Sequence, residues 1–444
     1  YRIEGTNFTG SLIIGHSTVG TLSAATYNTA LGLGAMDAIT QGDYNVVVGY
    51  NAGTAITTGS HNVLLGGKAG DSLTTGDQNI AIGYEALQYE DTDGRNIAIG
   101  HQSLNSLRAG ADGYNIAIGY DAGVTMSTGI NNVLIGGQAG DSLTSGSYNI
   151  AIGRLALAAE DADGYNIAIG YAALNTQNAG AAAYNVAVGH NAGTAITTGT
   201  NNVIVGGLAG DALTTGEYNI AIGRDALTTE DTGDRNVAIG YGALYNLNYD
   251  GAAYNVAVGH SAGSQMTTGT SNTLIGGLAG DALTDGNANV AVGRGALSGE
   301  TRGDRNVAIG YEALLAQNNT SDVDAYNTAI GYAAGTAMLT GTQNTVVGGQ
   351  AGDALTTGAN NVAIGYAALS TEDTGHGAVA IGAFALQDLD GGNTYNTAIG
   401  FSAGAEVTSG SYNTLLGGYA GDALTTGNNN TAIGYQALSA EDAH

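Results

Sequence analysis

The chain alternates short apolar segments with polar, glycine-rich ones at a fixed spacing. A typical apolar segment is Asn79-Ile-Ala-Ile-Gly83, with large aliphatic residues on either side of a smaller one. Large residues at every second position predict a β-strand rather than a helix. The asparagines mostly lie 17 residues apart, and every fourth step is longer, usually 19 residues. A fixed short period of this kind predicts a repeat architecture.

The segment occurs 25 times, and four successive steps form a 70-residue repeat. Clean repeats start near residues 45, 115, 185, 255, 327 and 396. Positions within a coil are numbered here from the asparagine, position 0, and the coils of a repeat from first to fourth. We predict an all-β fold: one parallel β-solenoid of about 25 coils over residues 11–444. Residues 1–10 are expected to be a cap or the end of a preceding segment of a longer protein.

Two positions are nearly constant along the chain. Asparagine occupies position 0 in 23 of the 25 coils, and glycine occupies position 4 in all of them. Such regular asparagine favours a structural ladder of stacked amides over a ligand-binding column. The glycine indicates a corner with positive φ or a close backbone approach. In the first clean coils the ladder residues are Asn45, Asn62, Asn79, Asn96 and Asn115, and the corners are Gly49, Gly66, Gly83, Gly100 and Gly119.

A large side chain at one position of a coil accompanies a small one at another position, as a close-packed interior requires. Glycine at position 8 accompanies an apolar residue at position 11, as in Gly53 and Ile56. In second coils a large residue at position 2, such as Leu64, accompanies glycine at position 5, such as Gly67. The strand is apolar on both faces, and one slim coil has no room to bury both. We therefore expect other copies of the chain to cover the second face, most simply in a homotrimer.

The composition of the chain disfavours several classes of binding partner and several kinds of chemistry. The chain has 38 acidic and 10 basic residues, a formal charge of -28, which disfavours nucleic acid as a partner. It has no apolar stretch of about 18 residues, so we expect no membrane insertion in this segment. Cysteine is absent, which excludes disulfides and thiolate metal sites. No catalytic triad or His-Glu-x-x-His motif is present, so we expect a protein that is not an enzyme and needs no cofactor.

Carboxylates recur at two fixed places in the repeat. Oxygen-rich turns suit calcium. If the chain binds calcium, the candidate ligands are Asp71, Glu90, Asp141, Glu160, Asp211 and Glu230. No calcium-loop consensus is present, which favours the alternative that these are solvated turn carboxylates. Glycoside cleavage by a carboxylate pair is disfavoured, because a catalytic pair would not recur along a whole stack.

Tyrosine and threonine raise two further alternatives. Tyrosines often precede the asparagine or fill position 5, as Tyr44 and Tyr50 do. Such columns favour tyrosines that pack against one another along the edge of the fold. A flat platform on which glycans stack is the alternative. Thr-Thr-Gly turns, such as Thr57-Thr58-Gly59, suggest an ice-binding array. Third and fourth coils interrupt that array, which argues against it.

Regularity ends at the longer links that follow the fourth coils. Specificity belongs to sites rather than to the fold itself. The links, which recur once in each repeat, are therefore the first place to look for contacts with a receptor. The candidate surface contacts are Arg108, Asp112, Asn178, Tyr249, Asp250, Asp322 and Asp324.

The Asn-x-Ala-Ile-Gly core resembles the head repeat of YadA-type trimeric autotransporter adhesins, a left-handed parallel β-roll with a shorter repeat. Residues 79–87 and 430–438, both of the form Asn-x-Ala-Ile-Gly-Tyr-x-Ala-Leu, are similar to repeats in phage tail-fibre proteins and related surface proteins. Some of those proteins end in a self-cleaving intramolecular chaperone. The resemblance covers about residues 11–444 and implies an intertwined or side-by-side homotrimeric fibre.

These observations predict a structural and adhesive extracellular fibre. The first hypothesis is a trimeric phage tail fibre or similar virion appendage, which attaches to a host-surface glycan or protein receptor. The alternative is a prokaryotic cell-surface adhesin or an extracellular filament subunit. An ice-binding or polysaccharide-processing solenoid is the third hypothesis, from a different functional class.

Overall fold

Every coil contributes one three-residue strand, and turns and bends form the rest of it. A computed structural model of the chain describes residues 10–15, 23–162 and 164–440. These described residues contain no helix. The coils form two compact units, Tyr1–Asn219 and Ile220–His444. The predicted parallel β-solenoid with 17-residue coils is confirmed, whereas the predicted N-terminal cap lies outside the described residues except for Gly10.

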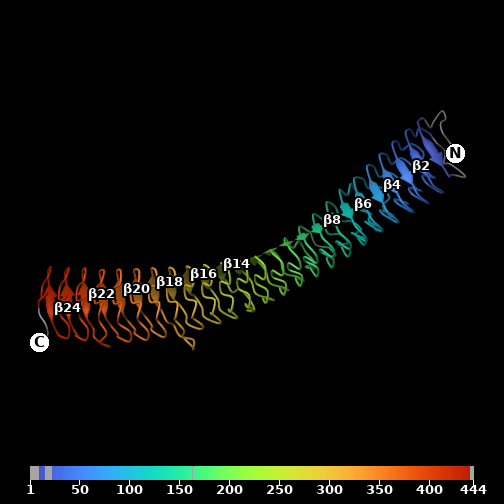
Figure 1. Ribbon diagram of the computed structural model, residues 1–444. Helices are drawn as coiled ribbons and strands as arrows, with labels where there is room; N and C mark the ends of the chain where they lie inside the picture. The colour runs from blue at the N-terminus through green and yellow to red at the C-terminus, as the bar shows by residue number, and fades with distance from the viewer. Residues whose placement is uncertain (1–9, 16–22, 163, 441–444) are drawn as a thin grey trace. The chain divides into compact units, whose positions relative to one another are not determined.

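The strands follow the sequence pattern from end to end (Figure 1). The first unit contains β1 (Leu12–Ile14), β2 (Thr29–Leu31), β3 (Val46–Val48), β4 (Val63–Leu65), β5 (Ile80–Ile82), β6 (Ile97–Ile99), β7 (Ile116–Ile118), β8 (Val133–Ile135), β9 (Ile150–Ile152), β10 (Ile167–Ile169), β11 (Val186–Val188) and β12 (Val203–Val205). The second unit contains β13 (Ile220–Ile222), β14 (Val237–Ile239), β15 (Val256–Val258), β16 (Thr273–Ile275), β17 (Val290–Val292), β18 (Val307–Ile309), β19 (Thr328–Ile330), β20 (Thr345–Val347), β21 (Val362–Ile364), β22 (Val379–Ile381), β23 (Thr397–Ile399), β24 (Thr414–Leu416) and β25 (Thr431–Ile433).

Within each unit, consecutive strands pair in parallel and each residue lies beside its equivalent in the next coil. Ile80 pairs with Ile97, and Ile82 pairs with Ile99, across β5 and β6. Register is kept across the longer links as well, since Ile97 of β6 pairs with Ile116 of β7. Every position of a coil therefore forms a column along the stack, and the extra link residues are accommodated outside the sheet.

The asparagines join neighbouring coils through both backbone and side chain. The backbone N–H of Asn62 donates to Oδ1 of Asn45 (2.9 Å), and its Nδ2 donates to the carbonyl of Gly76 in its own coil (2.9 Å). Asn79 repeats the arrangement with Oδ1 of Asn62 and the carbonyl of Asp93. The buried amides of Asn62 and Asn79 thus close their own coils and accept from the next ones, which satisfies polar groups that would be costly to bury unpaired. Fourth-coil asparagines depart from this arrangement, since Asn96 Nδ2 donates to the carbonyl of Gly94 in the preceding turn.

The glycine at position 4 is required by close stacking. Gly83 has φ +141°, and a Cβ there would lie 2.2 Å from the carbonyl oxygen of Gly100 in the next coil. No L-residue with a side chain fits that contact, and the backbone conformation is almost restricted to glycine. The corner glycines therefore set the distance between coils on this side of the stack.

The interior of each coil is filled from positions 2, 7, 8 and 11. Leu64, at position 2 of β4, is fully buried. A Cβ on Gly53 or Gly70, both at position 8, would come within 2.8 Å and 3.0 Å of Leu64 Cδ1. A Cβ on Gly67 would instead face the exposed ring of Tyr84. The predicted exchange between Leu64 and Gly67 is therefore wrong, because position 5 lies outside and the space for Leu64 comes from position 8.

Hydrogen bonds between coils stabilise turn residues whose backbone conformation is unfavourable. Lys68 and Gln78 adopt positive φ (59° and 61°), which is unfavourable for side chains of their kind. Their amides donate to carbonyls of the preceding coil, Tyr50 (2.8 Å) and Ser60 (3.0 Å). Threonine hydroxyls act likewise, since Thr57 Oγ1 donates to the carbonyl of Thr74 (3.2 Å). This use of the threonines within the stack argues against an ice-binding array.

Candidate functional site

The outer sheet face consists of the outward side chains of the strands, at positions 1 and 3, and the exposed residues that border them, at positions -1 and 5. In β5 the middle residue Ala81 is 0% exposed, whereas Ile80 and Ile82 are half-buried. Exposure at the outer positions reaches 49% at Leu31 and, in the last strand, 67% at Ile433. Side chains of a strand alternate between its faces. Two apolar columns of mostly valine and isoleucine therefore run along the outside of each unit.

Aromatic side chains stack along the borders of this face. Tyr148, Tyr165 and Tyr184 form one continuous stack, with ring centroids 5.1 Å apart at each step. Tyr84 and His101 form part of another, at 5.7 Å. Rings arranged in this way cover one another's faces and leave their edges and hydroxyls exposed. The columns therefore fit edge packing better than a platform on which sugars stack.

The outer sheet face differs in charge from the rest of the chain. None of the 38 acidic residues lies at positions -1, 1, 3 or 5 of any coil. Six of the ten basic residues do: Arg95, Arg154, Arg224, Arg235, Arg294 and Arg305. Each of these guanidinium groups lies over a tyrosine of the next coil, for example Arg154 over Tyr171 at 5.9 Å from the ring centroid. An acidic protein thus presents one apolar face that carries no carboxylate.

The third-coil glutamates are buried, and their interpretation as solvated turn carboxylates is wrong. All five that the structure describes are 0% exposed: Glu90, Glu160, Glu230, Glu300 and Glu372. Glu90 Oε1 accepts hydrogen bonds from the amides of Asp91 (2.9 Å), Thr92 (3.2 Å) and Asp93 (2.9 Å). The turn that follows the glutamate therefore supplies the donors that make its burial possible.

Two of these glutamates, Glu230 and Glu300, also bind the fourth-coil links. Glu230 Oε2 accepts from the amide of Tyr249 (3.2 Å), and Glu300 Oε2 accepts from the side-chain amide of Asn319 (2.9 Å). Burial raises the pKa of Glu230 to about 7, and the amides of Gly233 and Tyr249 act against that rise. The carboxylates of Glu230 and Glu300 thus join their own turns to the links that follow one coil later.

The first candidate surface contacts lie in links of the first unit. Arg108 is exposed, and its Nε donates to the carbonyl of Tyr89 (3.1 Å) while the guanidinium lies over that ring. Asp112 is exposed and forms an ion pair with Arg95. Asn178 is exposed as well, and its backbone amide bonds to the coil that follows. These side chains lie on the surface, where they are accessible to a receptor.

The other candidate contacts lie in the second unit. Tyr249 is half-buried, and its amide donates to the buried Glu230. Asp250 is exposed and accepts from a threonine hydroxyl of the preceding coil (2.7 Å). Asp322 and Asp324 are exposed, and Asp324 pairs with Arg305 at the border of the outer sheet face. Contact of these residues with a receptor stays a prediction.

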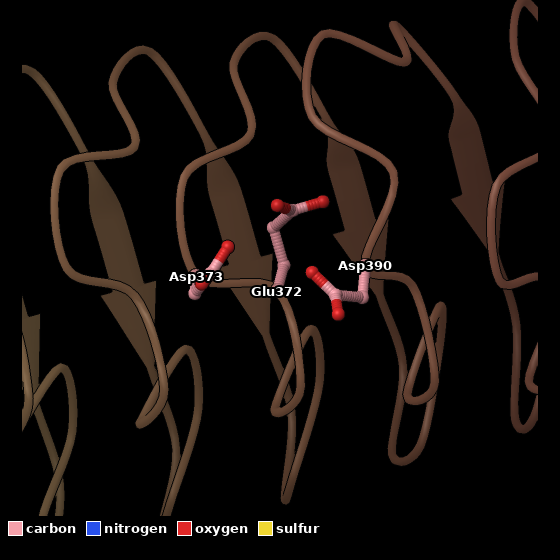
Figure 2. A group of neighbouring side chains, drawn as sticks. All are labelled: Glu372, Asp373 and Asp390. Atoms are coloured by element: carbon pink, nitrogen blue, oxygen red, sulfur yellow. The ribbon is translucent and has the colours of Figure 1, made fainter.

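The calcium candidates are distributed differently from the expectation. Asp71 and Asp141 are half-buried in second-coil turns, and burial raises the pKa of Asp141. Within the described ranges, one group of three acidic side chains has ligand atoms within 4.8 Å of one another: Glu372, Asp373 and Asp390 (Figure 2). None of the six predicted calcium ligands belongs to it. Sequence analysis missed the group, since only coil-to-coil register brings Asp390 beside the turn of Glu372.

Comparison with protein families and with curated proteins gives no match for the chain. No protein-family model matches it, and no curated protein matches it. No stretch of the described residues forms a helix that could span a membrane. The outer sheet face and the links are therefore the features of the molecule that bear on its function.

Proposed function

We propose that the chain is the shaft of a non-enzymatic extracellular fibre, in which three copies pack through their outer sheet faces and the fibre attaches to a host surface. The observation that supports this proposal most strongly is that the outer sheet face is apolar at its centre and free of carboxylates. Identical chains of formal charge -28 repel one another, and an acid-free contact face keeps that repulsion lowest. A large exposed apolar surface in an otherwise polar protein is typical of an interface.

A closed ring of three copies accounts for both faces of the strand. Each coil fills its own interior with the residue at position 2, so only positions 1 and 3 remain to be covered. Their arrangement in straight columns suits a partner with the same spacing between coils, which another copy of the chain has. The bordering arginines then lie near the acidic turns of the neighbouring copy, which favours association.

The mass of the protein in solution tests the assembly. Sedimentation or light scattering is expected to give a trimer of 44.0 kDa chains, about 132 kDa. In the variant Ile118→Asp, Ile135→Asp, two carboxylates are placed on the outer sheet face, and dissociation to monomers is expected. A wild-type chain that remains monomeric at micromolar concentration would refute the proposal.

A matched control separates position from charge. Thr128 and Ser145 are exposed turn residues in the same two coils as Ile118 and Ile135. Thr128→Asp with Ser145→Asp adds the same two charges away from the face, and this variant is expected to keep the wild-type mass. Dissociation of both double variants would show that added charge, rather than the face, determines assembly.

We place attachment at the exposed link residues. Asn178 and Asp322 belong to different links, and both are exposed. Replacing both with alanine is expected to weaken binding of labelled protein to a glycan array or to host cells at least tenfold. The mass and the circular dichroism spectrum should stay unchanged. Unchanged binding after all the exposed link residues are replaced would mean that the shaft is a spacer.

A further inference from the structure

In the fifth repeat three carboxylates converge at the junction of the third and fourth coils. Glu372 and Asp373 follow β21 in the third coil, and Asp390 lies in the fourth coil, after β22 (Figure 2). One oxygen from each lies within 4.8 Å of the other two. Glu372 is buried, whereas Asp373 and Asp390 are exposed, so the group opens to solvent on one side.

The fourth repeat shows what these positions do without like charges. There the equivalent residues are Glu300, Thr301 and Asn318. Thr301 Oγ1 donates to Asn318 Oδ1 (2.9 Å), which joins the two turns directly. Both oxygens of Glu300 have partners, since Asn319 donates its backbone amide to Oε1 and its side-chain amide to Oε2 (2.9 Å each). This junction is complete without any added group.

The fifth repeat lacks those side-chain donors, since Asp373 stands in place of Thr301 and Gly391 in place of Asn319. Glu372 Oε1 accepts from the amide of Gly375 (2.6 Å), but the buried Oε2 has no partner in hydrogen-bonding geometry. No lysine, arginine or histidine of the described chain forms an ion pair with the three carboxylates. Burial raises the pKa of Glu372, and the nearby charge of Asp390 raises it further. The group therefore holds excess negative charge and an unused buried oxygen.

We propose that Glu372, Asp373 and Asp390 bind one Ca²⁺ ion, which joins the third-coil turn to the fourth-coil turn of this repeat. All the donors are oxygens, which hard divalent cations prefer. Two ligands on opposite sides of Ca²⁺ lie about 4.8 Å apart, twice a Ca–O distance of about 2.4 Å. The oxygens of the group can therefore surround one ion, with water completing the shell on the exposed side. This inference concerns a site outside the outer sheet face and does not depend on the proposed trimer.

Natural variation among the repeats supports an ion at this place. The position of Asp390 is occupied by Arg108 in the first repeat and by Asn178 in the second. In the first repeat the residue at this position is itself a cation, Arg108, which donates to the carbonyl of Tyr89, and the fourth repeat uses a neutral hydrogen bond. The fifth repeat has neither, and a bound cation fills the same role. The ion would hold the link that begins at Asp390 against the stack.

Calcium titration of the full chain tests the proposal. After removal of metals with EDTA, wild-type protein is titrated with CaCl2 by isothermal calorimetry, and binding is expected at about 10⁻⁴–10⁻³ M. The variant Asp373→Thr, Asp390→Asn converts the junction to the residues of the fourth repeat. It is expected to lose one calcium per chain, or to bind it at least tenfold more weakly, and to lose the calcium-dependent rise in Tm.

The control variant Asp322→Asn, Glu406→Gln removes two exposed carboxylates of the same unit elsewhere. It is expected to keep the wild-type calcium stoichiometry. Equal calcium binding by wild type and by the fourth-repeat variant would overturn the proposal. So would a wild-type response that NaCl of matched ionic strength reproduces, because that indicates general screening of an acidic chain.

Discussion

The two faces of one strand obey different rules. Leu134 and Ile135 are neighbours in β8, yet Leu134 is 0% exposed and Ile135 is half-buried. On the inner face, size at one position is matched by glycine at another, as Gly123 and Gly140 make space for Leu134. On the outer face no such matching is present, and the common property is the absence of carboxylates. The inner face is thus restricted by shape and the outer face by charge.

This difference separates what folds the coil from what the coil presents. A change on the inner face must be accommodated within a space about one side chain wide, so it acts on the stability of the single chain. A change on the outer face leaves the coil intact, so it acts on the contact between chains. Adjacent residues of opposite orientation therefore give matched pairs of variants.

The largest effect is expected where backbones meet at the corner. Gly136 has φ +135°, and a Cβ there would lie 2.5 Å from the carbonyl oxygen of Gly153. Gly136→Ala is expected to lower the free energy of unfolding by about 3 kcal/mol or more, from backbone strain and separated coils. Gly137 points outward, and its Cβ would have no neighbour nearer than 3.9 Å. Equal denaturation midpoints for Gly136→Ala and Gly137→Ala would contradict the corner's role.

The next effect compares the two faces of β8 directly. Leu134→Ala leaves a cavity in a dry interior and is expected to cost about 2–5 kcal/mol. Ile135→Ala removes a half-exposed side chain and is expected to cost about 1 kcal/mol in the isolated chain. Urea denaturation at a concentration where the chain is monomeric checks both values. A cost for Ile135→Ala as large as that for Leu134→Ala would remove the distinction between the faces.

The periodicity predicted the strands because two independent signals agree in every coil. Alternating large residues gave the strand, and the glycine at position 4 gave its end, so β5 follows directly from Asn79-Ile-Ala-Ile-Gly83. The burial of the third-coil glutamates could not be predicted from the periodicity. Burial of Glu90 depends on three amides of the following turn, and no composition rule reports where backbone donors point.

The outer sheet face was within reach of the sequence, but the acidic group of the fifth repeat was not. Counting charges position by position, instead of over the whole chain, separates Arg154 and Arg224 from the 38 acidic residues. Asp373 and Asp390 meet only because register is restored after each turn. Links of unequal length conceal that alignment, so only the structure places the two residues together.

The buried glutamates give an effect of intermediate size that depends on pH. The pKa of Glu230 rises from about 4.5 in the unfolded chain to about 7 in the fold. The folded chain therefore binds more protons between these values, and stability is expected to fall as pH rises from about 4.5 to 7. The loss from this residue is on the order of 1–3 kcal/mol.

Comparing variants isolates that contribution from the other carboxylates of an acidic chain. Glu230→Gln cannot ionise, so it should lose less stability between pH 4.5 and 7 than wild type does. Glu406→Gln, at an exposed site, should follow the wild-type profile. Thermal or urea denaturation at several pH values checks the difference. A parallel profile for Glu230→Gln and wild type would mean that this carboxyl does not titrate in the range.

The smallest effect lies at the border of the outer sheet face, and it is the most informative about assembly. Arg154 lies over Tyr171, a contact worth about 0.5–1 kcal/mol when exposed and about 2 kcal/mol when desolvated. Arg154→Gln is therefore expected to cost less than about 1 kcal/mol in the monomer, but more in the assembled state, where neighbouring copies exclude water. Denaturation at low and at high protein concentration measures both values. If Arg154→Gln lowers the free energy of unfolding by the same small amount at both concentrations, this border stays in solvent. The contact between chains would then not include Arg154 and Tyr171.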